Sequence, residues 1–169
     1  MSLITYDNLA DIRKKFSGKN IVFCSGTFDL THAGHILFFE DCKKLGDVLI
    51  TATGNDETTK RYKGGLRPIF NEHMRLKILS SLKPIDHCFV HKGPVDGSQY
   101  HNSFLEEIFE KLRPDTYVVN SDASEIPYRR ELASKLNIGF VVLERTCPPE
   151  FMGVSTTKII EKLQQSFEI

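Results

Sequence analysis

The sequence lacks any long apolar run. Its most apolar stretches are short and interrupted, as at 48–52, whereas a membrane-spanning helix needs about 20 consecutive apolar residues. The N-terminal segment soon reaches two aspartates, Asp7 and Asp11, which is unlike a secretory signal or a transit peptide. We therefore expect a cytoplasmic protein with no membrane partner.

Net charge is also absent, because 22 lysines and arginines balance 22 aspartates and glutamates. This balance excludes a uniformly basic surface, and we expect no nucleic-acid partner. Cysteine is scarce, and its spacing forms no CxxC pair and matches no structural zinc pattern. We expect reduced, mostly buried thiols and no metal ion held by the protein alone at the four cysteines, which are Cys24, Cys42, Cys88 and Cys147.

Short runs rich in β-branched residues alternate with longer segments of helical periodicity. The runs predict strands at 21–24, 48–53, 87–90, 117–119 and 139–143. The periodic segments predict helices at 6–16, 33–45, 72–81, 104–112, 125–136 and 156–163, with Asn71 as an N-cap and Gly46 and Gly139 near helix ends. This alternation predicts an α/β fold, namely a Rossmann-like open parallel sheet of about five strands with helices on both faces. We expect one domain over residues 1–169, with a leading helix within 1–18 packed on it.

Ligands of open parallel sheets bind at the carboxyl ends of the strands, and polar residues follow the first strand here. Gly26 is expected to let the backbone turn tightly, and Thr31, Asp29 or Thr27 could cap the next helix. His32 and His35 lie three apart at the start of that helix, so they share a face. We expect Gly34 to leave room for a nucleotide between them.

Two imidazoles at a helix N-terminus suit phosphate chemistry. The helix dipole and backbone N–H groups favour an anion there. Displacement at an α-phosphate builds negative charge on phosphoryl oxygens and leaving pyrophosphate, and imidazole N–H donors stabilise it. Two surface histidines that happen to be neighbours would be the alternative, but their position after a strand and Gly-Thr-Phe-Asp disfavours it.

A second candidate phosphate site lies near the end of the sequence. Ser155, Thr156 and Thr157 begin a predicted helix, and hydroxyls with helix N-terminal amides can hold phosphate oxygens. Alone, these residues would be read as a simple helix cap. The presence of the histidine site in the same sequence favours the interpretation that they bind phosphate.

A basic segment, 55–68, follows the second predicted strand. We interpret it as a mobile loop that contains Lys60, Arg61, Lys63 and Arg67 around two glycines and that could close on phosphates. An ordinary solvated loop is the alternative. The position of the segment at the ligand end of the sheet favours a loop that closes on phosphates.

The segment GTFDLTHAGH at 26–35 resembles the HxGH signature of the cytidylyltransferase-like nucleotidyltransferases. That group includes glycerol-3-phosphate, phosphoethanolamine and phosphocholine cytidylyltransferases and heptose-phosphate adenylyltransferases. The resemblance implies that His32 and His35 contact the nucleotide phosphates and stabilise the transition state. It also implies that Ser155 and Thr156 bind the β- and γ-phosphates, because GVSTTKI resembles the second family signature.

The same resemblance assigns the remaining site residues. The family has a lysine in this region that contacts both substrates. Lys63 is the preferred candidate for it, and Lys60 is the second choice. Arg75 is expected to face the triphosphate, a solvent-facing helical arginine being the alternative. Asn120 and Asp122 stand beside the base and ribose, although Asn120 replaces a family glycine and Asp122 could simply cap a helix. The full nucleotide set is Gly26, Thr27, Phe28, Gly34, Arg75, Asn120, Asp122, Arg145, Ser155 and Thr156, and the acceptor set is Asp29, Lys60 and Lys63. The distance from Arg145 to the second signature is longer than in the glycerol-3-phosphate type, because the stretch 147–153 lies between them.

These residues predict a nucleotidyltransferase. The favoured reaction joins CMP from CTP to a small phosphorylated alcohol, polyol or sugar and releases pyrophosphate. The alternative is an adenylyltransferase that uses ATP on a sugar phosphate. The stretch GGLRPI at 64–69 resembles the heptose-phosphate type and favours this alternative. A hypothesis of another class is a nucleotide-binding module without turnover. The resemblance implies Mg²⁺ bound with the triphosphate, and a homodimer.

Overall fold

The computed structural model describes residues 2–91, 93, 104–144, 148–151 and 153–167. Its centre is a six-stranded sheet with the strand order β1-β4-β3-β2-β5-β6, and every neighbouring pair is parallel. The strands are β1 (Ser2–Leu3), β2 (Ile21–Gly26), β3 (Val48–Gly54), β4 (His87–His91), β5 (Thr116–Asn120) and β6 (Gly139–Leu143). The five expected strands are therefore confirmed, each within a few residues of its predicted bounds.

The sixth strand, β1, was not expected. It pairs with the edge of the sheet through Ser2 beside His87 and Leu3 beside Cys88. Two residues are too few to show the alternation by which a strand is recognised.

Apart from the short 3-10 helix η2, which was not expected, the helices match the predicted pattern except in one place. They are η1 (Tyr6–Asn8), α1 (Leu9–Lys15), α2 (Ala33–Lys43), α3 (Asp56–Lys63), α4 (Glu72–Leu79), α5 (Phe104–Leu112), α6 (Ile126–Lys135), η2 (Pro149–Phe151) and α7 (Thr156–Phe167). Asn71 caps α4 as expected, because its side chain accepts a hydrogen bond from Met74 N.

The exception is α3, since the basic segment was expected to be a loop. Asn55 caps this helix by accepting a hydrogen bond from Thr58 N at 2.9 Å. Two acidic residues occupy its first turn and three basic residues its last, as the helix dipole favours. Gly64 ends it with a φ of 94°, so the mobile-loop interpretation of this part was wrong.

Helices cover both faces of the sheet, as expected. On β2, Ile21 and Phe23 pack in the cluster that contains the buried side chains of α1 and α5. Val22 and Cys24 point the opposite way, into the cluster that contains Phe39 of α2. Successive residues of a strand point to opposite faces, so β2 is buried from both sides and serves as the rigid base of the site.

The described cysteines are free thiols and all are buried, namely Cys24, Cys42 and Cys88. Burial raises the pKa of Cys88 to about 11, which keeps the less reactive thiol form. Cys147 lies outside the described residues.

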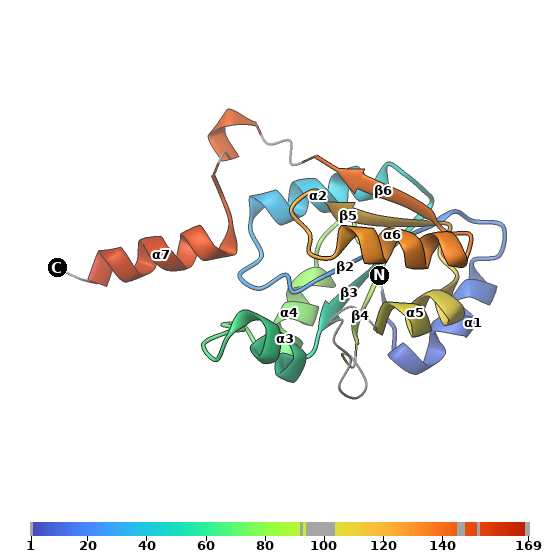
Figure 1. Cartoon of the computed structure of the whole chain (residues 1–169), viewed down its shortest axis with the longest axis horizontal. Helices are drawn as coiled ribbons and strands as arrows, with labels where there is room; N and C mark the ends of the chain where they lie inside the picture. Colours follow the sequence, from blue (N-terminus) through green and yellow to red (C-terminus); the bar gives the residue numbers. More distant parts are fainter. Residues whose placement is uncertain (1, 92, 94–103, 145–147, 152, 168–169) are drawn as a thin grey trace.

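Helix α7 projects away from the sheet, and the C-terminus lies at its far end (Figure 1). It is longer than predicted and leaves Leu163 51% exposed. Within the described part of the chain, no helix has both the length and the apolar character needed to cross a membrane.

Candidate active site

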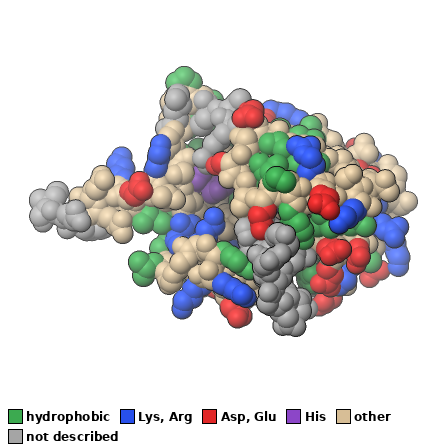
Figure 2. Space-filling model, in the orientation of Figure 1, with side chains coloured by type: hydrophobic (Ala, Val, Ile, Leu, Met, Phe, Trp, Pro, Cys, Tyr) green, Lys and Arg blue, Asp and Glu red, His purple; other side chains and the backbone are tan. Residues whose placement is uncertain are grey.

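A cleft of about 720 Å³ opens at the carboxyl ends of the central strands. It lies where the chain, after running from β2 to β3 and β4 on one side, continues with β5 and β6 on the other. This is the switch point at which open parallel sheets bind ligands. Figure 2 shows histidine side chains at the surface between α7 and the body of the protein, with lysine and arginine side chains close by.

The two motif histidines meet in the cleft. His32 is the N-cap of α2, so none of the three expected caps was right, and the Thr31 hydroxyl instead donates to Phe28 O. The rings of His32 and His35 stack with centroids 3.9 Å apart, which confirms that they share a face. His32 N donates to His35 Nδ1 at 3.4 Å. In the neutral ring the proton of His35 is then on Nε2, which makes Nε2 the donor.

Two glycines of the first motif serve close packing. A Cβ on Gly26 would lie 2.9 Å from the Phe28 ring, and the turn itself uses positive φ at Phe28 (49°) and Leu30 (45°). A Cβ on Gly34 would lie 3.2 Å from the His32 ring and 3.5 Å from Val154. The space at Gly34 is therefore taken by protein atoms, which corrects the expectation that it admits the nucleotide.

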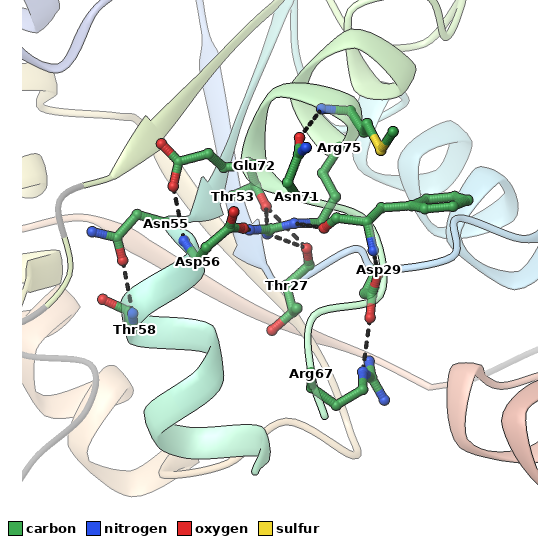
Figure 3. Close-up of polar contacts among 12 residues, drawn as sticks. Thr27, Asp29, Thr53, Asn55, Asp56, Thr58, Arg67, Asn71, Glu72 and Arg75 are labelled. Carbon is green, nitrogen blue, oxygen red and sulfur yellow. Dashed lines mark hydrogen bonds and ion pairs between the residues drawn. The ribbon is translucent and has the colours of Figure 1, made fainter. Parts of the chain in front are cut away.

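Asp29 lines the cleft, yet its carboxylate is fully engaged. It accepts hydrogen bonds from Arg67 Nε at 2.7 Å and from the backbone N–H groups of Ile69 and Phe70, both at 2.9 Å. The Asp29 side chain has 0% exposure, and Figure 3 shows it directed at Arg67. The Asp29 carboxylate thus fixes the segment between α3 and α4, and the expected contact of Asp29 with the acceptor stays a prediction.

Arg75 has a different place from both alternatives weighed for it. Its side chain has 0% exposure, so it neither faces solvent nor lines the cleft. Its guanidinium donates to Thr27 O, Thr53 Oγ1, Phe70 O and Asp56 Oδ1 at 2.6–2.9 Å (Figure 3). These contacts join the turn after β2 to the N-terminus of α3.

The two candidate lysines of α3 separate. Lys63 lines the cleft, and Lys60 is exposed outside it. Arg67 lines the cleft as well, held against Asp29.

The second motif reaches the first, as expected. Ser155 Oγ accepts a hydrogen bond from Lys158 N at 3.2 Å, and Thr156 Oγ1 donates to Asp29 O at 2.9 Å. Both residues line the cleft. The N-terminus of α7 is thereby tied to the turn that leads into the histidine pair, although 127 positions separate Thr156 from Asp29.

On the β5 side, Asn120 and Asp122 line the cleft, and their expected contacts with the base and ribose stay a prediction. Sequence reasoning missed Ser25 and Arg129 there. Arg129 is 7% exposed and donates through Nη1 to Tyr117 Oη at 2.5 Å, and Tyr117 Oη lies 3.3 Å from Ser25 Oγ. Burial raises the pKa of Tyr117. Nothing in the sequence distinguishes Arg129 from an ordinary arginine of an exposed helix.

Arg145 lies outside the described residues, so its place in the site stays a prediction.

On the β4 side, His91 is a cleft residue whose contacts the sequence did not specify. It is 4% exposed, and its ring lies face to face on Phe104 with centroids 3.7 Å apart. Burial, and then the nearby positive Arg75, lowers the pKa of His91 to about 3. It is therefore a neutral side chain at physiological pH.

The fold and the cleft define an α/β protein in which two stacked histidines and a hydroxyl-rich helix N-terminus face one cavity at the carboxyl ends of the strands. The sequence model of the family described as cytidylyltransferase-like matches residues 23–162. The chain belongs to this family of nucleotidyltransferases.

Named relatives refine this placement. The bifunctional protein HldE of Helicobacter pylori (strain P12) is 34% identical over 149 residues, which are 88% of this chain and 28% of that protein. HldE of Campylobacter jejuni (strain RM1221) is 33% identical over 151 residues, or 89% of this chain and 29% of that protein. The chain thus spans less than a third of the length of these curated relatives.

Two solved structures are similar. The lipopolysaccharide core biosynthesis protein from Thermoplasma volcanium GSS1 has a TM-score of 0.61 and 28% identity, over 78% of this chain and 99% of that chain. The pantoate-beta-alanine ligase from Francisella tularensis, complexed with beta-gamma ATP and beta-alanine, has a TM-score of 0.64 over 99% of this chain and 79% of that chain. At 18% identity, the second shows the fold alone.

Proposed function

We propose that this chain is an adenylyltransferase, which transfers AMP from ATP to a sugar phosphate and releases pyrophosphate. The observation that carries the proposal is the stacked pair of His32 and His35 at the N-terminus of α2, with the N-terminus of α7 tied beside it. Donors and helix termini so arranged match the charge that develops when an α-phosphate is displaced.

ATP and a sugar phosphate now have better support than CTP and a polyol. The motifs alone left a slight preference for CTP. The relatives are bifunctional proteins HldE and a lipopolysaccharide core biosynthesis protein. These names fit the heptose-phosphate branch of the resemblance, which the stretch GGLRPI at 64–69 also favours.

In this reaction an oxygen of the acceptor phosphate attacks the α-phosphorus in line. A new P–O bond forms, the bond from the α-phosphorus to the bridging oxygen breaks, and its electrons leave with pyrophosphate. His35 Nε2–H and the Lys63 ammonium stabilise the negative charge without covalent chemistry. The N-terminus of α7 holds the leaving phosphates through backbone N–H groups and the Ser155 hydroxyl.

Magnesium is proposed to enter with the triphosphate. Within the described part of the chain, no group of three His, Cys, Asp or Glu side chains is placed to hold a metal ion, and the Asp29 carboxylate is occupied. This donor set fits a cation carried mainly by phosphate oxygens and water. When bound, Mg²⁺ supplies charge neutralisation on the phosphates.

The proposal is tested by measuring pyrophosphate release with ATP or CTP against phosphorylated sugars, polyols and amino alcohols. Release that requires ATP and a sugar phosphate together supports it. Release that requires CTP would replace the adenylyl proposal with the cytidylyl alternative. Tight nucleotide binding without release across the whole panel would favour the binding module.

Lys63→Ala should lower kcat/KM by about tenfold to a hundredfold, because one cation facing the phosphates is lost. Lys60→Ala is the matched control, since Lys60 lies on the same helix but outside the cleft. The melting temperatures of both variants should equal that of the wild type, as both side chains are exposed. Equal losses in the two variants would show that Lys63 has no special role.

We also propose a homodimer, on the resemblance alone. Light scattering should then give a mass near twice the chain mass of 19.3 kDa, and the mass of a single chain would contradict it.

A further inference from the structure

The two sides of the cleft differ in chemistry. Asp122 and Arg129 bring charge to the side beyond β5. The side formed by β3, α3, β4 and α5 is lined mainly by uncharged groups, namely Gly54, Thr58, Thr59, Tyr62, His91 and Phe104, with the Lys63 ammonium at the end of α3. If Asn120 and Asp122 stand beside the base and ribose, as the family resemblance implies, the mainly uncharged side remains for the acceptor. This step rests on the proposed function.

His91 is built into that side as a fixed donor. Gly93 N donates to its Nδ1 at 3.0 Å, so the proton of the neutral ring is on Nε2. Stacking on Phe104, at 3.7 Å and 3° between ring planes, fixes the plane of the ring. Among the described residues, no hydrogen bond engages Nε2, which lies close enough to Gly54 that a Cβ there would be 3.2 Å away.

The surroundings of His91 are equally constrained. A Cβ on Gly93 would lie 1.8 Å from Thr58 Oγ1, and Gly93 has a φ of 79°. Only glycine fits this position, and its N–H is the group that orients the imidazole. An imidazole held by a backbone N–H, an aromatic face and two glycines presents Nε2–H in one direction.

We propose that His91 Nε2–H binds a hydroxyl oxygen of the acceptor and selects neutral, polyhydroxylated phosphates over phosphorylated amino alcohols. Thr58 and Thr59 hydroxyls and an aromatic ring beside it suit a sugar, while Lys63 and Arg67 at the cleft suit its phosphate. A substituted ammonium group would require a carboxylate or an aromatic cage. The described residues of this side include no carboxylate, and the Phe104 ring, whose face a cage would need, is stacked on His91.

The test compares His91→Phe with the wild type on sugar phosphates that each lack one hydroxyl. Phenylalanine keeps a ring to stack on Phe104 and removes the donor. We expect the acceptor KM to rise about tenfold with kcat and the Kd for ATP nearly unchanged, as for one lost neutral hydrogen bond. One deoxy acceptor should show the same loss on the wild type and no further loss on the variant. Unchanged acceptor KM in His91→Phe would overturn the proposal, as would additive losses for every deoxy acceptor.

His87→Phe is the matched control, because His87 is a buried histidine at the other end of the same strand and should leave both constants as in the wild type. If His91→Phe does not fold, Gly54→Ala gives the second test, since its methyl group would crowd Nε2 while the imidazole remains. It should also raise the acceptor KM, and an unchanged value would overturn the proposal.

Calorimetry keeps this inference separate from the proposed function. If the wild type releases no pyrophosphate, the proposed function fails, but sugar-phosphate binding in the presence of a non-hydrolysable ATP analogue is still measurable. Binding about tenfold weaker in His91→Phe supports the inference. Equal binding, or no binding to the wild type, overturns it.

Discussion

His35→Ala should lower kcat by about 10²- to 10³-fold, the cost of removing one donor to a developing oxyanion. His35 lies in the cleft, stacked on His32 at 3.9 Å and packed edge-on by Phe28. Its Nε2–H is aimed by the hydrogen bond at Nδ1. Because the stabilised charge appears mainly in the transition state, the Kd for ATP should change by less than about tenfold.

Steady-state kinetics and nucleotide titration of the same preparation measure both quantities. His73→Ala is the control, since His73 is an exposed histidine on α4 and should behave as the wild type. A variant that loses nucleotide affinity and turnover to the same degree would contradict a transition-state role for His35. It would favour the nucleotide-binding module.

Arg75→Met should lower the free energy of unfolding by about 3 kcal/mol or more. The substitution removes a buried guanidinium with four hydrogen bonds and leaves Thr27 O and Phe70 O without that donor. For a chain of this length, such a loss lowers the melting temperature by roughly 6–12 °C. Calorimetry or circular dichroism measures it, and bound ATP should restore only part of the loss.

Lys77→Met on the same helix is the control, because Lys77 is exposed and should shift the melting temperature little. If Arg75 instead bound the triphosphate, Arg75→Met would raise the Kd for nucleotide with little change in the melting temperature. That result would restore the role first expected for it.

The sheet and the two phosphate motifs could be predicted because their signals are local. Strands such as Val48–Gly54 are short runs rich in apolar and β-branched residues, and the spacing of His32 and His35 is fixed once a helix begins beside them. The contact of Thr156 with Asp29 was not predicted, but both motifs were expected to hold phosphates of one nucleotide, and the structure brings them together.

Helix α3 escaped prediction because it has almost no apolar face. Only Thr59 is buried along it, so the 3.6-residue periodicity is missing. Its signals were the Asn55 cap, the acidic first turn and Gly64 at its end. Read together, these would have indicated a helix in place of a loop.

The roles of Asp29 and Arg75 could not be read locally. Asp29 meets Arg67, which is 38 positions away, and Arg75 meets Thr27, which is 48 positions away. A charged residue near a phosphate motif looks the same in the sequence whether its side chain faces the cleft or a buried partner. Burial decides between the two, and burial depends on the whole fold.

The central claim, attack on the α-phosphorus of ATP by a sugar phosphate, is tested most directly by following isotopic label. ATP labelled at the α-phosphate and ATP labelled at the γ-phosphate are each incubated with the protein, magnesium and the active acceptor. The account predicts that the α-label enters a nucleoside diphosphate sugar and the γ-label leaves in pyrophosphate, one for one. Appearance of ADP, with the γ-label on the acceptor or in free phosphate, would contradict it.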